Sequence, residues 1–352
     1  MEPRAAADLG RRPLSDDIVL ALDVGGTKLA AGVVSGDGRV RSMATIPSRS
    51  EEGPDAMIAR LVALGRSMVP AAGMDLSAIR AIGIACGGPL DPSSGIVQEP
   101  PNLPGWHDVP IVDIVSAAFD RPTVVDNDAT AGALAEWWFG AGHGGSVRDL
   151  VYLTISTGIG GGLILDGRVY RGQAENAGEL GHLTVDYRGR PCGCGRRGCL
   201  EAYASGSSIA RRAREALEDG AASSLAGLPA VTAEDVAEAA AAGDPLAARI
   251  WDETTEILGS ALANILDVFN PELVVLGGGV TRAGAQLLDP VRAAALRDAM
   301  APAARSATII LSDLGDELGV ISAAAVAFDR ARLETDGTSG DLPMALPGAS
   351  RA

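Results

Sequence analysis

The 352-residue sequence is poor in several features, and each shortage excludes a class of protein. Aromatic residues make up only 3% of the chain, so its core must be built from Ala, Val, Leu and Ile. No uninterrupted run of about 18 apolar residues occurs, which leaves no transmembrane candidate, and the apolar run at 18–22 is too short for a signal peptide. No cluster of Lys or Arg interrupts the net charge of −16, which argues against nucleic-acid binding.

What remains is typical of a globular protein. Hydrophobic residues make up 47% of the chain and charged residues 21%, and a chain of this length predicts two domains. Cys86 lies far from the other three cysteines, so the four do not form the even, widely spread pattern of a secreted disulfide protein. We therefore expect a cytoplasmic protein.

One supersecondary pattern occurs twice. Residues 18–46 predict three antiparallel strands joined by a glycine turn and a Gly-Asp-Gly hairpin, and residues 149–172 repeat that order after a glycine-rich linker at 140–148. The other predicted elements are helices at about 54–69, 112–119, 246–269, 287–300 and 319–330, and strands within 78–86, 122–126, 272–280 and 307–312.

The first glycine turn (residues 23–28) follows a buried strand. Its glycines allow backbone N–H groups to approach phosphate oxygens, Thr27 and Lys28 add donors, and Asp23 can hold a hydrated Mg²⁺. An ordinary tight hairpin explains this turn alone equally well. The residues of this turn that are candidates for binding a phosphate-bearing cofactor are Asp23, Gly25, Gly26, Thr27 and Lys28.

A second glycine turn (residues 157–162) occupies the same place in the second copy of the pattern. Two such turns in similar half-molecules predict a phosphate site held from both sides, with Thr157, Gly158 and Gly160 as candidates. A third glycine turn (Gly277, Gly278 and Gly279) follows a strand, where an adenosine is plausible, although a plain strand-to-helix turn also fits it.

Residues 126–128, Asp-Asn-Asp, lie between a strand and a helix. A carboxylate there is either a helix N-cap or a general base. Beside a phosphate site, a carboxylate is what phosphoryl transfer to a hydroxyl requires, because it orients the attacking oxygen and accepts its proton. We take Asp126 or Asn127 as the cap and Asp128 as the base.

These motifs together resemble the ROK family of sugar kinases, repressors and open reading frames. The run from Ile155 through the glycines to His182 is similar to the family signature, and D-x-G-G-T-K at 23–28, N-D-A at 127–129 and C-x-C-G-x-x-G-C-L-E at 192–201 follow in the family's order. The resemblance covers about residues 18–330.

The resemblance implies an α/β protein of the actin-like ATPase fold, with two RNase H-like domains and a cleft between them. It implies a small domain of residues 17–126 plus about 313–331 and a large domain of residues 127–312 with a zinc knuckle. The polar or Pro/Gly-rich composition of residues 1–16 and about 332–352 predicts disordered tails. The resemblance further implies a homodimer or homotetramer with a sugar site formed by Gly88, Asn102, Asn127, Asp128, Glu179, His182 and Glu201. Asn and Glu side chains can bridge adjacent hydroxyls.

The crowded cysteines are the other candidate site. Cys192, Cys194 and Cys199 with His182 complete the ligand set of a closed tetrahedral zinc site, which would be structural and would orient His182. Free thiols and a strained Cys192–Cys194 disulfide are the alternatives, and the zinc site is favoured over both.

We weigh three functional hypotheses for this sequence. The first is an ATP-dependent hexose kinase acting on the 6-hydroxyl of glucose, with an N-acetylmannosamine kinase as its alternative. The second is a sugar-responsive repressor, which we do not expect because only 17 residues precede the first strand. The third is a sugar-binding protein without kinase activity, which should lack the base or the glycine turns. ATP, ADP and polyphosphate all stay open as the phosphoryl donor.

Overall fold

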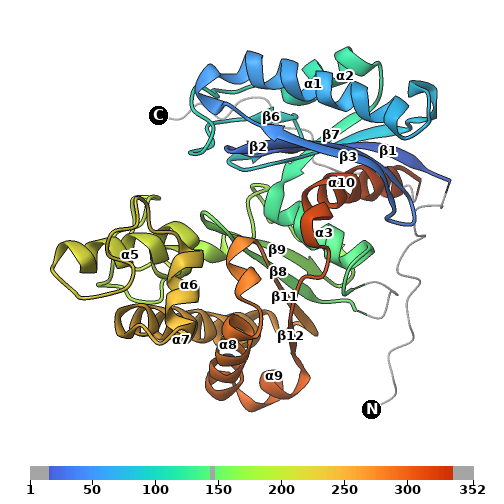
Figure 1. Cartoon of the computed structure of the whole chain (residues 1–352). Coiled ribbons are helices and arrows are strands. Elements are labelled where there is room, and N and C mark those ends of the chain that lie inside the picture. The colour runs from blue at the N-terminus through green and yellow to red at the C-terminus, as the bar shows by residue number, and fades with distance from the viewer. Residues whose placement is uncertain (1–15, 143–146, 336–352) are drawn as a thin grey trace, which may run out of the picture.

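The sequence repeat folds into two five-stranded sheets with helices between them (Figure 1). The computed structural model describes residues 16–142 and 147–335, so most of the tails predicted at 1–16 and 332–352 lies outside the described residues, as does His143. Both sheets have the same arrangement, in which a three-stranded antiparallel meander continues into two parallel strands. The predicted internal repeat is thereby confirmed.

The first sheet has the strand order β3-β2-β1-β4-β7. Its strands are β1 (Ile18–Val24), β2 (Lys28–Ser35), β3 (Val40–Pro47), β4 (Ala81–Cys86) and β7 (Thr123–Asn127). The second sheet has the corresponding order β10-β9-β8-β11-β12. Its strands are β8 (Leu150–Ile155), β9 (Ile159–Leu165), β10 (Arg168–Val169), β11 (Leu273–Gly277) and β12 (Thr308–Leu311), and β5 (Leu90–Asp91) pairs with β6 (Ile96–Val97) in a separate hairpin.

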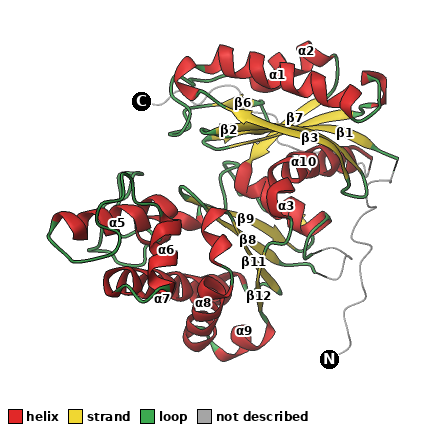
Figure 2. Ribbon diagram, in the orientation of Figure 1, coloured by secondary structure: helices red, strands yellow, loops and turns green. Residues whose placement is uncertain are grey.

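The helices form layers on both sides of each sheet (Figure 2). Helices α1 (Pro54–Ala71) and α2 (Ile111–Phe119) cover the outer face of the first sheet, and α3 (Asp128–Trp138) and α10 (Leu318–Thr335) lie between the two sheets. The far side of the second sheet carries α7 (Pro245–Phe269), α8 (Ala285–Asp298) and α9 (Ala301–Ser306). Helices α4 (Glu201–Ala204), α5 (Gly206–Glu218) and α6 (Ala233–Ala241) pack on α7. The short 3-10 helices are η1 (Ser50–Glu52), η2 (Leu76–Ala78), η3 (Leu180–His182), η4 (Gly279–Ala283) and η5 (Gly315–Glu317).

Burial on both faces explains why the central strands are continuous apolar runs. In β1, Leu20 and Leu22 pack in the core under α1 and α2, whereas Val19 and Ala21 pack against the helices between the sheets. A central strand covered by helices on both sides needs apolar residues at every position, since successive side chains point to opposite faces.

The helix between the sheets approaches the first sheet at backbone distance. A Cβ atom at Gly83 of β4 would lie 1.9 Å from the carbonyl oxygen of Ala323 in α10. Only glycine allows that approach. Helix α10 therefore packs against the first sheet, although it follows the second sheet in the chain. This packing agrees with the predicted assignment of residues 313–331 to the small domain. The domain boundaries themselves stay a prediction.

Two predicted boundaries were wrong. Helix α10 continues to Thr335, so the C-terminal tail does not begin at residue 332, because residues 331–335 contain neither Gly nor Pro and extend the helix. The predicted helix at 287–300 ends at Asp298, and a separate helix, α9, begins at Ala301 with Pro302 in its first turn.

Two smaller observations complete the fold. Trp137 and Trp138 at the end of α3 are buried in the core. Among residues 16–142 and 147–335, no helix combines the length and the apolar character that crossing a bilayer would need.

Candidate active site

The three residues at the β7–α3 junction have three different surroundings. The Asn127 side chain is the N-cap of α3, because its Oδ1 accepts hydrogen bonds from the Ala129 and Thr130 amides at 2.9 and 3.4 Å. Asp126 is buried in an ion pair with Arg171. No ion pair among the described residues ends on Asp128, which leaves it as the carboxylate available for chemistry.

Asp128 and Asp23 form an acidic pair at the ends of α3 and β1. Protein surrounds the Asp128 carboxylate on most sides although part of its surface stays accessible, and this desolvation raises its pKa, while the Ala129 amide partly offsets the effect. Burial also raises the pKa of Asp23 to about 6, with the charge of Asp128 as the second cause and Lys28 opposing both. The pair therefore attracts a cation or a hydroxyl donor.

The first glycine turn lies against the loop that carries Asn102. The amide of Gly25 donates to the Lys28 carbonyl at 3.1 Å, and Ser48 holds the turn from outside by donating to the Gly26 carbonyl at 2.6 Å. A Cβ atom at Gly26 would lie 2.5 Å from the Asn102 carbonyl oxygen. The side chains of Thr27, Lys28 and Asn102 are exposed, so they can meet a ligand.

The predicted sugar residues gather around Asp128. A Cβ atom at Gly88 would lie 3.1 Å from Asn127 Nδ2, which places the 87–89 loop beside the cap of α3. Burial raises the pKa of Glu179; His182 opposes this, and the charges of Asp128 and Glu201 add to it. These charges act on Glu179 from nearby, and the contact is direct for His182, whose Nε2 lies 3.7 Å from the Glu179 carboxylate.

Glu201 connects this cluster to the second glycine turn. Its Oε2 accepts a hydrogen bond from the Ile159 amide at 2.9 Å, and a Cβ atom at Gly158 would lie 2.6 Å from the same oxygen. Gly160 packs against Ala129 of α3 instead of facing open space. A direct phosphate contact by Gly158 or Gly160 stays a prediction.

The predicted metal ligands meet in one cluster. The ligand atoms of His182, Cys192, Cys194 and Cys199 all lie within 4.8 Å of one another, with His182 Nδ1 at 3.7 Å from Cys192 Sγ and Cys194 Sγ at 3.7 Å from Cys199 Sγ. Tetrahedral zinc would place sulfur atoms about 3.8 Å apart and sulfur and nitrogen about 3.6 Å apart, given bond lengths of about 2.3 and 2.05 Å. The four residues therefore fit zinc, and His182 Nε2 points away from the cluster to Glu179 at 3.7 Å.

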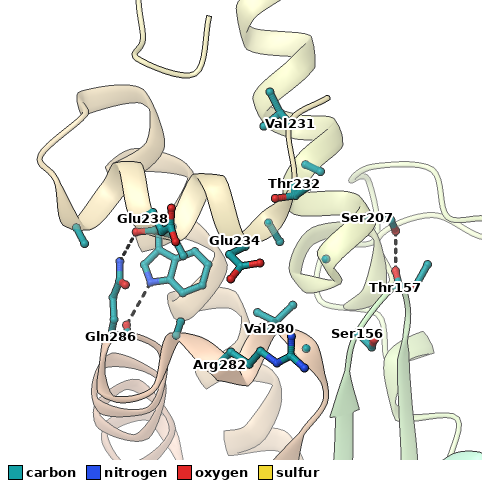
Figure 3. A pocket seen from close by; sticks show the side chains of 18 residues that line it. Ser156, Thr157, Ser207, Val231, Thr232, Glu234, Glu238, Val280, Arg282 and Gln286 are labelled. Atoms are coloured by element: carbon teal, nitrogen blue, oxygen red, sulfur yellow. Dashed lines mark hydrogen bonds between the residues drawn. The ribbon is translucent and has the colours of Figure 1, made fainter. Parts of the chain in front are cut away.

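A cavity of about 620 Å³ opens beside the second glycine turn (Figure 3). Ser156, Thr157 and Gly279 line one side of it, and Glu234 and Arg282 extend into it from α6 and η4. Of the third glycine turn, only Gly279 is among the lining residues, because Gly277 packs on Tyr152 and Gly278 on the Ile155 backbone.

The inner wall of the cavity is built from residues that the sequence did not single out. The Trp251 indole donates to the Gln286 carbonyl at 3.2 Å, and the Gln286 amide donates to the Ala237 carbonyl at 2.8 Å. These bonds tie α6, α7 and α8 together behind a flat aromatic ring. In the sequence, Trp251 is one more apolar residue of a helical pattern, so nothing distinguished it.

The two remaining His and Cys residues within the described ranges lie outside the metal cluster. His107 is exposed on a loop, where its Nδ1 lies 3.5 Å from Glu99. Cys86 is buried at the end of β4, and burial raises the pKa of its thiol well above the ordinary value, with the charges of Asp128 and Asp23 adding to the effect. It is therefore a small apolar residue and not a nucleophile.

Known proteins share this sequence and this architecture. A glucokinase of Thermotoga maritima is 35% identical over 316 residues, which are 89% of this chain and 98% of that protein. An N-acetylmannosamine kinase of Citrobacter koseri is 37% identical over 261 residues, which are 74% of this chain and 83% of that protein.

A solved structure extends the comparison to the fold. The ROK family glucokinase of Streptomyces griseus in complex with glucose and AMPPNP superposes with a TM-score of 0.75 and 32% identity, covering 89% of this chain and 99% of that one. The resemblance drawn from the motifs, including the actin-like ATPase fold, is confirmed. With the ROK family model matching residues 19–330 as well, the chain belongs to the ROK family.

Proposed function

We propose that this protein is a cytoplasmic sugar kinase that transfers a phosphoryl group from ATP to the 6-hydroxyl of glucose, with Asp128 as the general base. The observation that carries the proposal is the position of Asp128, an available carboxylate beside the predicted sugar residues and between the first two glycine turns. The glucokinase relatives support the same activity. As a family expectation, the enzyme works as a homodimer or homotetramer.

The sugar is recognised by polar groups that surround Asp128. Asn127 uses its Oδ1 as the helix cap, which leaves its Nδ2 donor for a hydroxyl. Glu179 and Glu201 are acceptors for sugar O–H groups, and Gly88 and Asn102 line the same region from their loops. A site built to hydrogen-bond hydroxyls rejects analogues that lack them, because its own polar groups would be left unpaired.

Phosphoryl transfer needs a base, a donor site and a neutralising charge. Asp128 accepts the proton of the 6-hydroxyl as that oxygen bonds to the terminal phosphorus and the bond from this phosphorus to the bridging oxygen breaks. We expect the Gly26 amide and the second glycine turn to face phosphate oxygens, whereas the Gly25 amide donates to the Lys28 carbonyl and keeps the first turn closed. Asp23 fits a hydrated Mg²⁺, which would neutralise phosphate charge when bound.

The nucleoside of ATP belongs in the 620 Å³ cavity. The cavity lies next to the second glycine turn, has the size of a small-molecule site and combines apolar walls with a few polar groups. A polyphosphate donor has no group that would need such a space, so the cavity favours ATP or another nucleotide.

The cysteine cluster holds a structural zinc ion. Three sulfurs and His182 Nδ1 fill a tetrahedral shell and leave no position for a water molecule. The work of the metal is then to fix the His182 ring so that Nε2 faces Glu179 and the sugar.

One experiment tests the activity directly. In a coupled assay with ATP and Mg²⁺, we expect kcat/KM for glucose to exceed the values for fructose, mannose, N-acetylglucosamine and N-acetylmannosamine by about tenfold or more, since hydroxyl-specific sites discriminate at least to that extent. The Citrobacter koseri relative makes N-acetylmannosamine the second candidate. A clear preference for that sugar would replace glucose in the proposal.

Asp128→Asn tests the base. We expect kcat to fall by about 10²- to 10⁴-fold, the usual contribution of general base catalysis, while the Kd for glucose measured by calorimetry changes only a few-fold. Asp120→Asn removes a carboxylate from the left-handed end of α2, where Asn is well tolerated, and serves as the control. Near-normal turnover by Asp128→Asn would rule out this residue as the base.

Ala233→Trp tests where the donor binds. Ala233 lines the cavity and is only partly buried, so an indole there fills the space without disturbing the core. We expect the KM for ATP to rise at least tenfold, about 1.4 kcal/mol, while glucose affinity is kept. Ala242→Trp, on an exposed residue at the end of the same helix and outside the cavity, should leave both unchanged. An unaltered KM in Ala233→Trp would place the nucleoside elsewhere.

Cys194→Ser tests the zinc site. Elemental analysis of protein purified without chelator should find about one zinc per chain in the wild type and in Cys86→Ala, and almost none in Cys194→Ser. The KM for glucose should rise in Cys194→Ser only. Loss of a group that orients a site residue from behind commonly lowers affinity or activity by about 10- to 100-fold. A metal-free wild-type protein would contradict the assignment.

A further inference from the structure

A buried ion pair ties the edge of the first sheet to the edge of the second. Arg171 follows the edge strand β10, and its Nε and Nη2 donate to Asp126 Oδ2 at 3.0 and 2.6 Å. Asp126 lies in β7, the edge strand of the first sheet, and only 3% of its side chain is exposed. Arg171 Nη2 also lies 3.9 Å from a carboxylate oxygen of Asp329 in α10, which packs on the first sheet.

The Asp126 end of this pair is bonded to the segment that carries the base. Its second oxygen, Oδ1, accepts a hydrogen bond from the Asn127 amide at 2.9 Å. Asn127 in turn caps α3, and Asp128 is the first residue of that helix. A shift of the Asp126 carboxylate would therefore move the cap and the base together.

The Arg171 end begins the loop that leads to Glu179. The Arg171 carbonyl accepts a hydrogen bond from the Ala177 amide at 2.9 Å, which closes the loop on itself. Gly178 then packs on the backbone of Gly161 in β9, so close that a Cβ atom would lie 2.4 Å from its carbonyl oxygen. Glu179 follows directly, so Arg171 at the start of the loop and the Gly178 contact at its end together hold this carboxylate.

We propose that Arg171 is a positioning residue, which fixes the base Asp128 relative to the loop that carries Glu179. This role rests on the proposed kinase function, and Arg171 acts through Asp126 without touching the substrates. The pair joins elements whose sequence positions are 45 residues apart, one from each sheet. A displacement of about 1 Å at a reacting centre can cost about 100-fold in rate, so such a tie has a kinetic effect.

Arg171→Met alone cannot test this, because removing one partner of a buried pair also leaves an unpaired charge and destabilises the fold. The experiment therefore compares Arg171→Met, Arg171→Lys and the double variant Asp126→Asn with Arg171→Met. In the double variant Asp126 no longer carries a charge that needs Arg171, although Asp329 still loses its contact with the guanidinium, so we expect Tm to recover part of the way toward the wild-type value. We expect kcat to stay about 10- to 100-fold low and the KM for glucose to stay raised.

The other readouts separate positioning from general damage. The KM for ATP should stay within about threefold in every variant, because neither Asp126 nor Arg171 lines the cavity or belongs to a glycine turn. Arg171→Lys should recover part of kcat by restoring the charge and one donor. Arg121→Met is the matched control. Arg121 precedes the opposite end of β7 and donates to the Ile79 and Leu76 carbonyls, so its loss should lower Tm without changing kcat.

Two results would overturn the assignment. If the double variant regained wild-type kcat together with wild-type Tm, Arg171 would only neutralise a buried charge. An inactive wild-type protein on every hexose would overturn the kinase function, and this role with it. An active wild type with a fully active double variant would overturn the positioning role alone.

Discussion

The contact between α3 and β9 is the constraint on which the site depends. A Cβ atom at Gly162 would lie 2.4 Å from the Ala129 carbonyl oxygen, so helix and strand touch through their backbones. Because Asp128 is the first residue of α3 and the second glycine turn leads into β9, this contact sets the separation between the proposed base and the proposed binding site of the phosphoryl donor. A larger residue in β9 would push α3 away and move the base with it.

Four carboxylates lie near this contact between α3 and β9. Asp23, Asp128, Glu179 and Glu201 surround one space, and the pKa values of the first three are raised. A raised carboxyl pKa means that the ionised form costs free energy in the empty site. Ligands that bring a cation or hydroxyl donors offset this cost. The proximity of the carboxylates therefore favours the binding of a metal-bound phosphate chain and of a polyhydroxylated sugar.

The sequence predicted those parts of the molecule that depend on short stretches. The apolar run of β1, the turn after it and the Asn127 cap are all determined by residues within a few positions of one another, and the metal cluster by residues within eighteen positions. The pairing of Asp126 with Arg171 and the wall formed by Trp251 depend on elements that meet only after folding. The role of glycines in close packing was hidden too, because a glycine that contacts a helix and one that faces a phosphate look alike in a sequence.

Glu201 shows how the local pieces become one site. Its Oε2 holds the Ile159 amide of the second glycine turn, while its Oε1 lies 3.8 Å from the Cys192 sulfur of the metal cluster. One carboxylate therefore contacts both the strand that begins the donor site and the loop that orients His182. Because a carboxylate is planar and rigid, a shift of the cysteine loop turns the oxygen that holds Ile159. A displacement of the proposed zinc ligands would therefore reach the second glycine turn through Glu201, which contacts both.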